Sequence, residues 1–347
     1  MKENIKSVLL IDVMNLFIRN FAAVPMTDDN GNHVGGWFGA IQSLRSSIER
    51  LKCNHVICCW EGKGSAERRR KILKEYKEGR KFTGFNRKIH PDPERERESF
   101  KEQLIKLKML FSYLPVNQLS VDYLEADDVI AYICKKILKD DYEKIILSTD
   151  RDYFQLVDEY TTIYRPTKSK KNPDGEHITQ QHMIDELKCF PTNWILVKCA
   201  VGDSDNIEGV KNEAAEGKKS RGIGNNTFLK DFPFLVNQKD VDGEKTNFQI
   251  EDIIEFAKKQ EHKKYKKYFT EESIELLKRN EKLIQLLDPN ISFTSSINIE
   301  KVLEEQPIRL NPFKFRLELS SAEVSSRYID TWLSTFSGIT PLFNKSN

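Results

Sequence analysis

Hydrophobic positions recur at two spacings along much of the chain. Short apolar runs predict buried strands at residues 7–11, 55–60, 144–148 and 161–164, and near Val116. Apolar positions three and four residues apart predict helices at residues 35–51, 94–114, 125–137, 180–187 and 194–201, and from Phe228 onward. Because predicted strands and helices alternate, the pattern indicates an α/β fold with a mostly parallel central sheet flanked by helices.

Five acidic residues gather in one stretch of this pattern. Glu125, Asp127 and Asp128 fall in the first turn of a predicted helix, and Asp150 and Asp152 follow a predicted strand. One or two acids there are explained by helix capping and the helix dipole. Five crowded carboxylates are hard to ionise unless positive charge lies between them. Hard cations such as Mg²⁺ or Mn²⁺ prefer oxygen ligands, so the cluster predicts a metal site.

Four further acids have similar surroundings. Asp12 ends the first predicted strand, where a metal ligand and a turn cap are equally good interpretations. Glu61 follows the second strand, and Asp203 and Asp205 lie in a Gly-Asp-Ser-Asp-Asn sequence after a predicted helix. Because ligands of open α/β sheets bind at the carboxyl ends of the strands, these acids are candidates for the same site.

Residues 62–81 are strongly basic, with nine Lys and Arg against three Glu, a local net charge of +6. Such a run is typical of a solvated helix face, but its density beside an acid cluster favours phosphate binding. The candidate nucleic-acid contacts are Arg68, Arg69, Arg70 and Lys74. Gly222 and Gly224 form a glycine-bearing turn between two short predicted helices, which offers backbone amides to a phosphate.

The whole composition adds three constraints. The 347 residues suffice for one large domain or two smaller ones, and the net charge of +2 conceals the separation of acids from bases. Six cysteines without a Cys-x-x-Cys pair predict reduced core residues. There is no apolar stretch of membrane-spanning length and no recognisable signal peptide, so we expect an intracellular protein without membrane contact.

The order of these motifs resembles the 5′ nuclease superfamily, which includes flap endonucleases and phage 5′→3′ exonucleases. The resemblance runs from Val8 to Phe232 and is strongest to the stand-alone phage enzymes. It is carried by the following residues: Asp12, Glu61, 125–128 (EADD), 148–152 (STDRD), 202–206 (GDSDN), 76–80 resembling YKxxR, 36–39 resembling a Gly-aromatic element, and 222–224 (GIG).

The resemblance implies a PIN-like α/β fold with a helical arch and a helix-hairpin-helix (H3TH) subdomain. It divides the chain into a catalytic domain at 1–190, which includes a basic arch at 62–100, and a DNA-binding subdomain with a helical extension at 191–290. A C-terminal extension at 291–347 follows. Nothing that resembles a polymerase domain is present in the sequence.

The resemblance also implies two Mg²⁺ or Mn²⁺ ions, with a K⁺ ion at the hairpin. The first metal site would be built by Asp12, Glu61, Glu125 and Asp127, and the second by Asp128, Asp150, Asp152, Asp203 and Asp205. Lys77 and Arg80 would stand beside the scissile phosphate, and Phe82 or Phe85 would stack on bases or pack within the arch.

Three departures from the family pattern affect these assignments. Glu61 replaces the usual Asp, which lengthens the side chain by one methylene. Asp203 and Asp205 are one residue closer together than in the usual Asp-x-x-Asp, so which of them binds metal is open. Residues 211–220 lengthen the hairpin.

The implied function is a structure-specific 5′→3′ exonuclease and flap endonuclease that removes 5′ flaps or RNA primers in DNA replication. Its partners would be flapped, nicked or RNA-primed DNA and a single-strand-binding protein or sliding clamp. The expected state is a monomer, in the host cytoplasm if the protein is phage-encoded. Two alternatives stay open: a PIN-type endoribonuclease, which would need neither arch nor hairpin, and a non-catalytic DNA-junction-binding homologue, which would be expected to lack some of the acids.

Overall fold

The structure is a computed structural model. It describes residues 6–80, 84–86, 88–166, 174–211, 222–259, 268–305, 309–320 and 324–343. Within these residues, no helix combines the length and the apolar character needed to cross a membrane.

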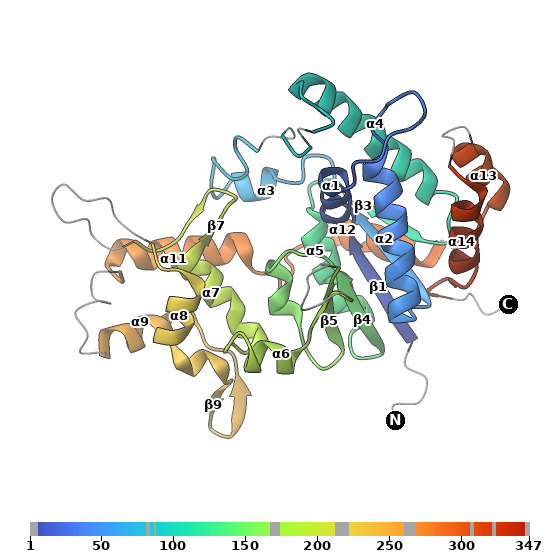
Figure 1. The fold of residues 1–347 in the computed structure, drawn as a ribbon. Helices are drawn as coiled ribbons and strands as arrows, with labels where there is room; N and C mark the ends of the chain where they lie inside the picture. The colour runs from blue at the N-terminus through green and yellow to red at the C-terminus, as the bar shows by residue number, and fades with distance from the viewer. Residues whose placement is uncertain are drawn as a thin grey trace.

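A six-stranded sheet forms the centre of the molecule (Figure 1). Its strands are β1 (Lys6–Asp12), β2 (His55–Trp60), β3 (Asn117–Ser120), β4 (Tyr142–Leu147), β5 (Thr161–Arg165) and β6 (Glu176–Ile178). The spatial order is β3-β2-β1-β4-β5-β6, and every neighbouring pair is parallel except β5 and β6. The predicted mostly parallel sheet is therefore confirmed.

Alternating residues of the strands enter two hydrophobic cores, one on each face of the sheet. Leu9 and Ile11 face the core that contains α1 (Val13–Ala23), α2 (Gly35–Leu51) and α4 (Pro93–Phe111). Val8 and Leu10 face the other core, together with α5 (Ala126–Tyr132) and α7 (Trp194–Val201). Burial on both faces explains why the strands are apolar throughout rather than alternating.

The helix predicted over 125–137 is α-helical in its first half and π-helical in its second half. After α5 the chain continues as a π-helical turn, η1 (Ile133–Leu138), which keeps Ile133, Cys134 and Leu138 buried. For residues 133–138 the apolar spacing therefore identified the buried side but not the hydrogen-bond pattern. A short 3₁₀ helix, η2 (Asp152–Leu156), follows β4.

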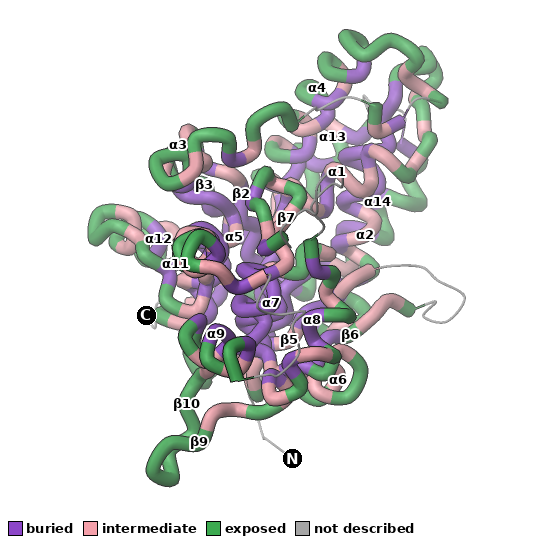
Figure 2. Tube along the Cα trace, turned by 90° about the vertical axis from the view of Figure 1, so that its left-hand side faces the viewer, coloured by how far each residue is buried: buried purple, intermediate pink, exposed green. Residues whose placement is uncertain are grey.

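Smaller elements complete the central and C-terminal regions. The helices are α6 (Gln180–Asp185), α8 (Asn225–Asp231), α9 (Ile250–Lys259), α11 (Glu271–Ile284), α12 (Phe293–Glu305) and α13 (Pro312–Ser320), with 3₁₀ turns η3 (Pro191–Asn193) and η4 (Pro233–Val236). Two short hairpins pair β7 (Gly202–Asp203) with β8 (Ile207–Glu208), and β9 (Lys239–Val241) with β10 (Glu244–Thr246). Figure 2 shows the β9–β10 hairpin projecting as an exposed element.

The described residues beyond 290 contribute to the cores. Phe315 of α13 and Trp332 of α14 (Ser326–Phe336) are completely buried in the core that contains α2, and Trp332 Nε1 donates to Gln42 Oε1 at 2.7 Å. Residues 337–343 are joined to the segment before β2, because Thr340 N donates to Asn54 O at 2.9 Å. The division into three parts stays a prediction.

The segment between β2 and α4 contains less helix than an arch of helices would have. In its described residues, helical structure before α4 is confined to α3 (Glu67–Arg70), and residues 71–79 form mainly turns. Phe82 lies outside the described residues. Phe85 packs against Phe21 and Phe100, with ring centroids 6.3 and 5.8 Å apart, which favours packing over base stacking.

All six cysteines lie within the described residues, and each is buried with a free thiol. Burial raises the pKa of the Cys53 thiol to about 12 and raises the pKa of every other cysteine as well. This confirms the prediction of reduced core residues.

Two histidines join the loop before α2 to the segment before α4. His33 Nε2 lies 2.9 Å from Val24 O, and His90 Nε2 lies 3.1 Å from His33 Nδ1. Both contacts form when each ring is neutral, with Nε2 as donor. Burial lowers the pKa of both histidines, partly opposed by the charge of Glu96.

This pair predicts a loss of stability in mild acid. Below the ordinary pKa of 6.5, the unfolded chain takes up protons that the folded pair resists, so stability is complete above about pH 7 and falls through the window below 6.5. The raised pKa values of the buried acids act in the opposite sense, so the pair is isolated by comparison with His90→Gln, which keeps a donor for His33 and removes one titrating group. Between pH 7.5 and 5.5 we expect the Tm of the wild type, measured relative to the Tm of His90→Gln, to fall by a few degrees. An equal change of Tm in both proteins would contradict this assignment.

Candidate metal centre and phosphate site

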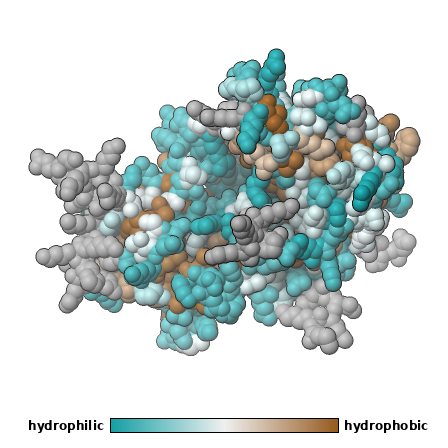
Figure 3. Space-filling model, in the orientation of Figure 1, coloured by the Kyte–Doolittle hydropathy of each residue, from teal (hydrophilic) through white to brown (hydrophobic). Residues whose placement is uncertain are grey.

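A cavity of about 320 Å³ opens at the carboxyl ends of the central strands. In the space-filling view, a hollow with hydrophilic walls lies between the regions of α1 and α3 (Figure 3). The acids that line the cavity are Asp12, Glu61, Glu125, Asp127, Asp150, Asp152 and Asp205, and its cations are Arg19, Lys77 and Arg80. Seven of the nine predicted metal ligands and both predicted phosphate contacts thus share one cavity.

The register of the parallel strands places three of these acids near the same edge of the sheet. Asp12 pairs with Cys59 across β1 and β2, while Ile11 pairs with Leu147 across β1 and β4. Glu61 and Asp150 therefore each stand two residues beyond the level of Asp12, on either side of it. The parallel ladder fixes the ends of the strands, and Glu61 and Asp150 follow one residue after β2 and three residues after β4.

Asp12 is both the last residue of β1 and the N-cap of α1. Its Oδ1 accepts from Asn15 N at 3.0 Å, and its Oδ2 accepts from the Tyr153 hydroxyl at 3.3 Å. Burial, reinforced by the nearby charge of Asp150, raises the pKa of Asp12 to about 6 despite these bonds. The carboxylate would be stabilised by added positive charge.

Glu61 and Glu125 each present an oxygen that lacks a protein partner. Glu61 Oε2 and Glu125 Oε1 are buried and accept no hydrogen bond from any described residue. Burial raises the pKa of Glu61 to about 8, although Lys77 opposes the rise. Burying a carboxylate oxygen without a hydrogen-bond partner costs free energy, so these two oxygens are candidates for binding a cation.

Arg69 is a predicted nucleic-acid contact that lies among carboxylates of the protein. It is only 2 % exposed, and its guanidinium lies 2.8 Å from Glu125 Oε2, 3.0 Å from Asp127 Oδ2 and 3.2 Å from Asp128 Oδ1. Three carboxylates of one helix turn hold it inside the protein and raise its pKa, although burial alone would lower it. In the structure the partners of Arg69 are thus carboxylates of the protein, and its contact with a nucleic acid stays a prediction.

Arg69 also affects the pKa values of Asp127 and Asp128 in α5. Burial would raise the pKa of Asp127, but Arg69 and Lys77 outweigh burial and hold it below its ordinary value. Asp128 is buried outside the cavity lining and accepts from Arg68 at 2.6 Å as well as from Arg69. Burial and the charge of Asp127 raise the pKa of Asp128.

Lys198 of α7 connects the acids after β4 with those after α7. Its Nζ lies 2.9 Å from Asp152 Oδ1 and also pairs with Asp203. Burial and the charge of Asp150 raise the pKa of Asp152, whereas Lys198 outweighs burial and lowers the pKa of Asp203. Asp203 is therefore bound to Lys198 and does not line the cavity, while Asp205 does.

The two predicted phosphate contacts face the acids. Lys77 Nζ lies 2.6 Å from Glu125 Oε2, which also accepts from the Tyr76 hydroxyl at 3.0 Å. Arg80 Nε donates to Asp205 Oδ1 at 2.8 Å, and the side chain of Arg80 is half exposed. Lys77 has a left-handed backbone with φ of 54°, stabilised by a 3.2 Å bond from its N–H to Asp205 O.

The remaining predicted contacts lie further out. Arg70 and Lys74 line a second cavity of about 670 Å³, which shares Glu61, Lys77 and Arg80 with the first. Arg68 is partly exposed but is bound to Asp128. Gly222 and Gly224 are exposed at the turn before α8, while residues 212–221 of the hairpin insert lie outside the described residues.

The donor chemistry fits hard divalent cations. As the side chains stand, no group of three or more His, Cys, Asp or Glu residues in the described ranges has the spacing of a metal site. Arginine and lysine side chains instead supply the charge that neutralises the acids. Two orphan carboxylate oxygens and raised acid pKa values show that the positive charge is insufficient, and all-oxygen donors suit Mg²⁺ or Mn²⁺.

Comparison with known proteins places this site in a family. Residues 7–188, just over half of the chain, match the family described as 5′-3′ exonuclease, N-terminal resolvase-like domain. The chain belongs to this family. The 5′-3′ exonuclease match includes the acids from Asp12 to Asp152 together with Lys77 and Arg80.

The curated relatives of this family member are much longer proteins. A thermostable DNA polymerase I of Thermus thermophilus is 32% identical over 225 residues, which cover 64% of the chain and 23% of the polymerase. DNA polymerase I of Bacillus subtilis is 30% identical over 207 residues, which cover 59% and 22%. The chain thus spans about a quarter of the length of these relatives.

Solved structures share the fold of this family member at low sequence identity. The T5 D15 protein co-crystallised with metal ions has a TM-score of 0.55 and 20% identity, covering 91% of this chain and all of its own. Flap endonuclease-1 from Methanococcus jannaschii has a TM-score of 0.52 and 15% identity, covering 96% and 94%.

Sequence reasoning missed several side chains that organise this candidate site. Asn15 Oδ1 accepts from Thr149 N at 3.1 Å and from Thr149 Oγ1 at 3.0 Å, which ties the ends of β1 and β4 together. Lys198 and Tyr153 also hold acids, Lys198 from an otherwise apolar run and Tyr153 from the position directly after Asp152. The one available signal was a lone lysine among the apolar residues of 194–201.

Proposed function

We propose that the chain is a structure-specific 5′→3′ exonuclease and flap endonuclease that uses two Mg²⁺ or Mn²⁺ ions. It would remove 5′ flaps or RNA primers during DNA replication. The observation that carries the proposal is the single cavity in which acids from β1, β2, β4 and α5 meet Lys77 and Arg80. Acids alone would suit many metal sites, but acids opposed by two cations suit a metal-bridged phosphodiester.

The cavity acids are the proposed metal ligands. Asp12, Glu61, Glu125 and Asp127 would hold one ion, while Asp150, Asp152 and Asp205 would hold the other. Asp128 and Asp203 do not line the cavity and would contribute charge from behind it. Of the closely spaced pair in the Gly-Asp-Ser-Asp-Asn sequence, Asp205 is therefore favoured as the direct ligand.

Hydrolysis forms one bond from phosphorus to a water oxygen and breaks the bond from phosphorus to the 3′ oxygen. The products are a 3′ hydroxyl, which takes up a proton, and a 5′ phosphate. Bound divalent ions supply the lowered pKa of the attacking water and charge for the departing oxygen. The protein orients the phosphate and neutralises the remaining negative charge.

Lys77 and Arg80 would perform that neutralisation. Without DNA their partners are Glu125 and Asp205, the same carboxylates that would bind the ions. Ion binding to these acids would release both cations toward an incoming phosphate, so ions and substrate would favour each other. Tyr76 donates to Glu125 and would keep that carboxylate oriented during the exchange.

A basic route leads toward this position. Arg70 and Lys74 line the larger cavity that is continuous with the acids, and they would guide a single-stranded 5′ end. The exposed amides at Gly222 and Gly224 would hold duplex phosphates, with K⁺ at the hairpin. The T5 D15 flap endonuclease has been crystallised with DNA and metal ions, and its fold matches 92% of this chain at a TM-score of 0.55.

A single assay tests the proposal. Cleavage of 5′-flap, nicked and RNA-primed DNA is compared with cleavage of single-stranded RNA in the presence of Mg²⁺. We expect cleavage of the 5′-flap duplex, leaving 5′ phosphates, and none in EDTA. Preference for single-stranded RNA would establish the PIN-type endoribonuclease instead, and flap binding without cleavage in any divalent ion would establish a junction-binding protein. Monomeric state and recruitment by a clamp or single-strand-binding protein stay predictions.

A further inference from the structure

The end of α11 receives buried side chains from two segments of the catalytic region. Arg69 Nε donates to Leu283 O at 2.8 Å. Gln155 Nε2 donates to Ile284 O at 3.1 Å, and Gln155 Oε1 accepts from Leu286 N at 2.7 Å. These partners are far apart in sequence, and residues 283–286 lie outside the part of the chain that matches the family.

Gln155 connects this backbone directly to an acid of the site. It is completely buried, and its Nε2 also donates to the carbonyl of Asp152 at 2.9 Å. The amide therefore uses both of its donor hydrogens and its acceptor on backbone groups. The peptide that carries Asp152 is thereby fixed relative to Ile284 and Leu286.

Arg69 makes the second connection. Its terminal nitrogens hold Glu125, Asp127 and Asp128, while its Nε is used by Leu283 O. A guanidinium is planar, so the bond at Nε also sets the direction in which the terminal nitrogens point. The end of α11 thus orients the cation that orders the acids of α5.

Asn280 makes the third connection, from the same helix to α7 and β8. It is completely buried, and its Nδ2 donates to Cys199 O at 2.9 Å and to Glu208 O at 2.7 Å. These residues flank Asp203 and Asp205 in the sequence. Residues 280–286 therefore contact the supports of all three groups of acids.

We propose that residues 280–286 are a positioning segment that sets the carboxylates of the metal site through Gln155 and Arg69. The inference rests on the proposed function, because it assigns these acids to metal binding. Gln155 and Arg69 touch neither substrate nor reacting atoms and act only through the acids that they hold. Groups that orient metal ligands in this way commonly govern metal affinity and turnover together.

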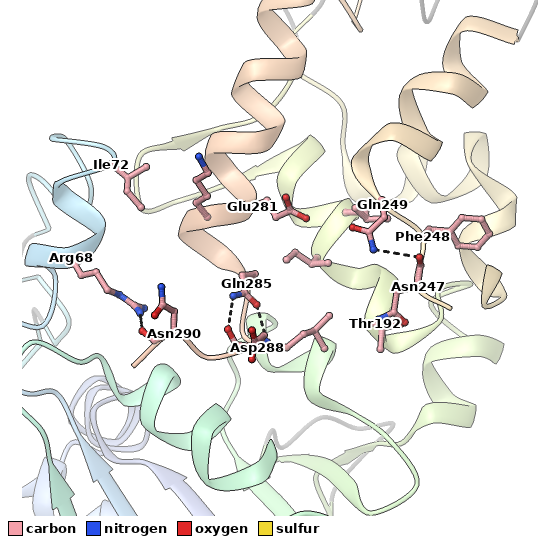
Figure 4. Close-up of a pocket in the computed structure, with 14 residues that line it drawn as sticks. Arg68, Ile72, Thr192, Asn247, Phe248, Gln249, Glu281, Gln285, Asp288 and Asn290 are labelled. Carbon is pink, nitrogen blue, oxygen red and sulfur yellow. Dashed lines mark hydrogen bonds between the residues drawn. The ribbon is translucent and has the colours of Figure 1, made fainter. Parts of the chain in front are cut away.

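The opposite face of the positioning segment supplies a control. Glu281, Lys282 and Gln285 line a separate cavity of about 580 Å³. In this cavity Gln285 bonds to Asp288, and Arg68 donates to Asn290 O (Figure 4). Lys282 is exposed, and it lines neither of the cavities that contain the acids. A change at Lys282 perturbs the same helix turn without touching a bond to the site.

The test compares Gln155→Met, of similar length but without the amide, with Lys282→Ala. Mn²⁺ affinity is measured by the paramagnetic resonance of the free ion, and kcat and flap-DNA Kd are measured separately. We expect Gln155→Met to weaken Mn²⁺ binding by about 10- to 100-fold and to lower kcat similarly. Its DNA Kd in EDTA should stay within about twofold, and Lys282→Ala should match the wild type in every measurement.

The outcomes separate positioning from stability and from the proposed function. If Gln155→Met lowers only Tm and keeps wild-type Mn²⁺ affinity and kcat, the proposal is overturned. If the wild type cleaves no DNA but its Mn²⁺ affinity depends on Gln155, the proposed function fails and the positioning role stands. Should Gln155→Met not fold, Arg69→Lys, which keeps the charge but loses the Nε bond, is measured under the same criteria.

Discussion

Replacing Asp150 and Asp152 together with asparagine is expected to abolish Mg²⁺-dependent cleavage while preserving the fold and flap binding. Both carboxylates line the acid cavity, and asparagine keeps their shape but removes two negative charges. If these acids hold one ion, several kcal/mol of transition-state stabilisation disappear, which corresponds to a loss of at least about 10³-fold in rate. Single-turnover cleavage of a 5′-flap duplex measures the effect.

The same variant should be no less stable than the wild type in EDTA. Burial raises the pKa of both acids, so the folded chain disfavours their ionisation, and a neutral amide removes that cost. Asp140→Asn with Asp141→Asn is the matched control, because these exposed acids lie near the opposite end of β4. Undiminished cleavage by the first variant would remove the second metal site from the proposal.

Lys77→Ala is expected to lower kcat by about 10²- to 10³-fold and to change flap-DNA Kd by less than about fivefold. The ammonium lies within the acid cavity rather than on the outer basic surface, so it would contact one phosphate, where charge develops in the reaction. Alanine tolerates the left-handed backbone of Lys77 as well as lysine does, so the substitution adds no new strain. Measuring kcat and Kd separately distinguishes reaction from binding.

Lys71→Ala provides the comparison for this prediction. Lys71 is an exposed cation of the same basic segment, but it lines neither cavity that contains the acids. Its loss should affect only salt-dependent DNA affinity, and weakly. If Lys77→Ala behaves like Lys71→Ala, with a change in Kd alone, then Lys77 does not stand beside the reacting phosphate.

The sequence predicted the acid-bearing frame because that frame depends on local pattern. Apolar runs located β1, β2 and β4, and parallel strands present their carboxyl ends at one edge of a sheet. Asp12, Glu61 and Asp150 could therefore be placed together from the order of strands and acids alone. Their side chains do line one cavity, although the roles of individual acids remain proposals.

The parts that escaped prediction depend on long-range partners. Arg69 looks like its basic neighbours in sequence, and only the acids of α5, 56 or more positions away, decide that it is buried. Gln155 and Asn280 bond to backbone atoms, and no side-chain pattern in the sequence identifies such partners. α11 supplies none of the acids of the cavity, but its buried end bonds to Arg69 and Gln155.

Because all six cysteines are buried, alkylation of their thiols can be used to measure unfolding of the unmodified chain. Thiolates react with alkylating reagents, whereas these cysteines are sheltered and their raised pKa values disfavour the thiolate. Labelling at neutral pH would then follow opening of the cores rather than surface chemistry. The folding of each variant described above can thus be compared by counting modified cysteines in a mass spectrum, without adding a dye or a tag.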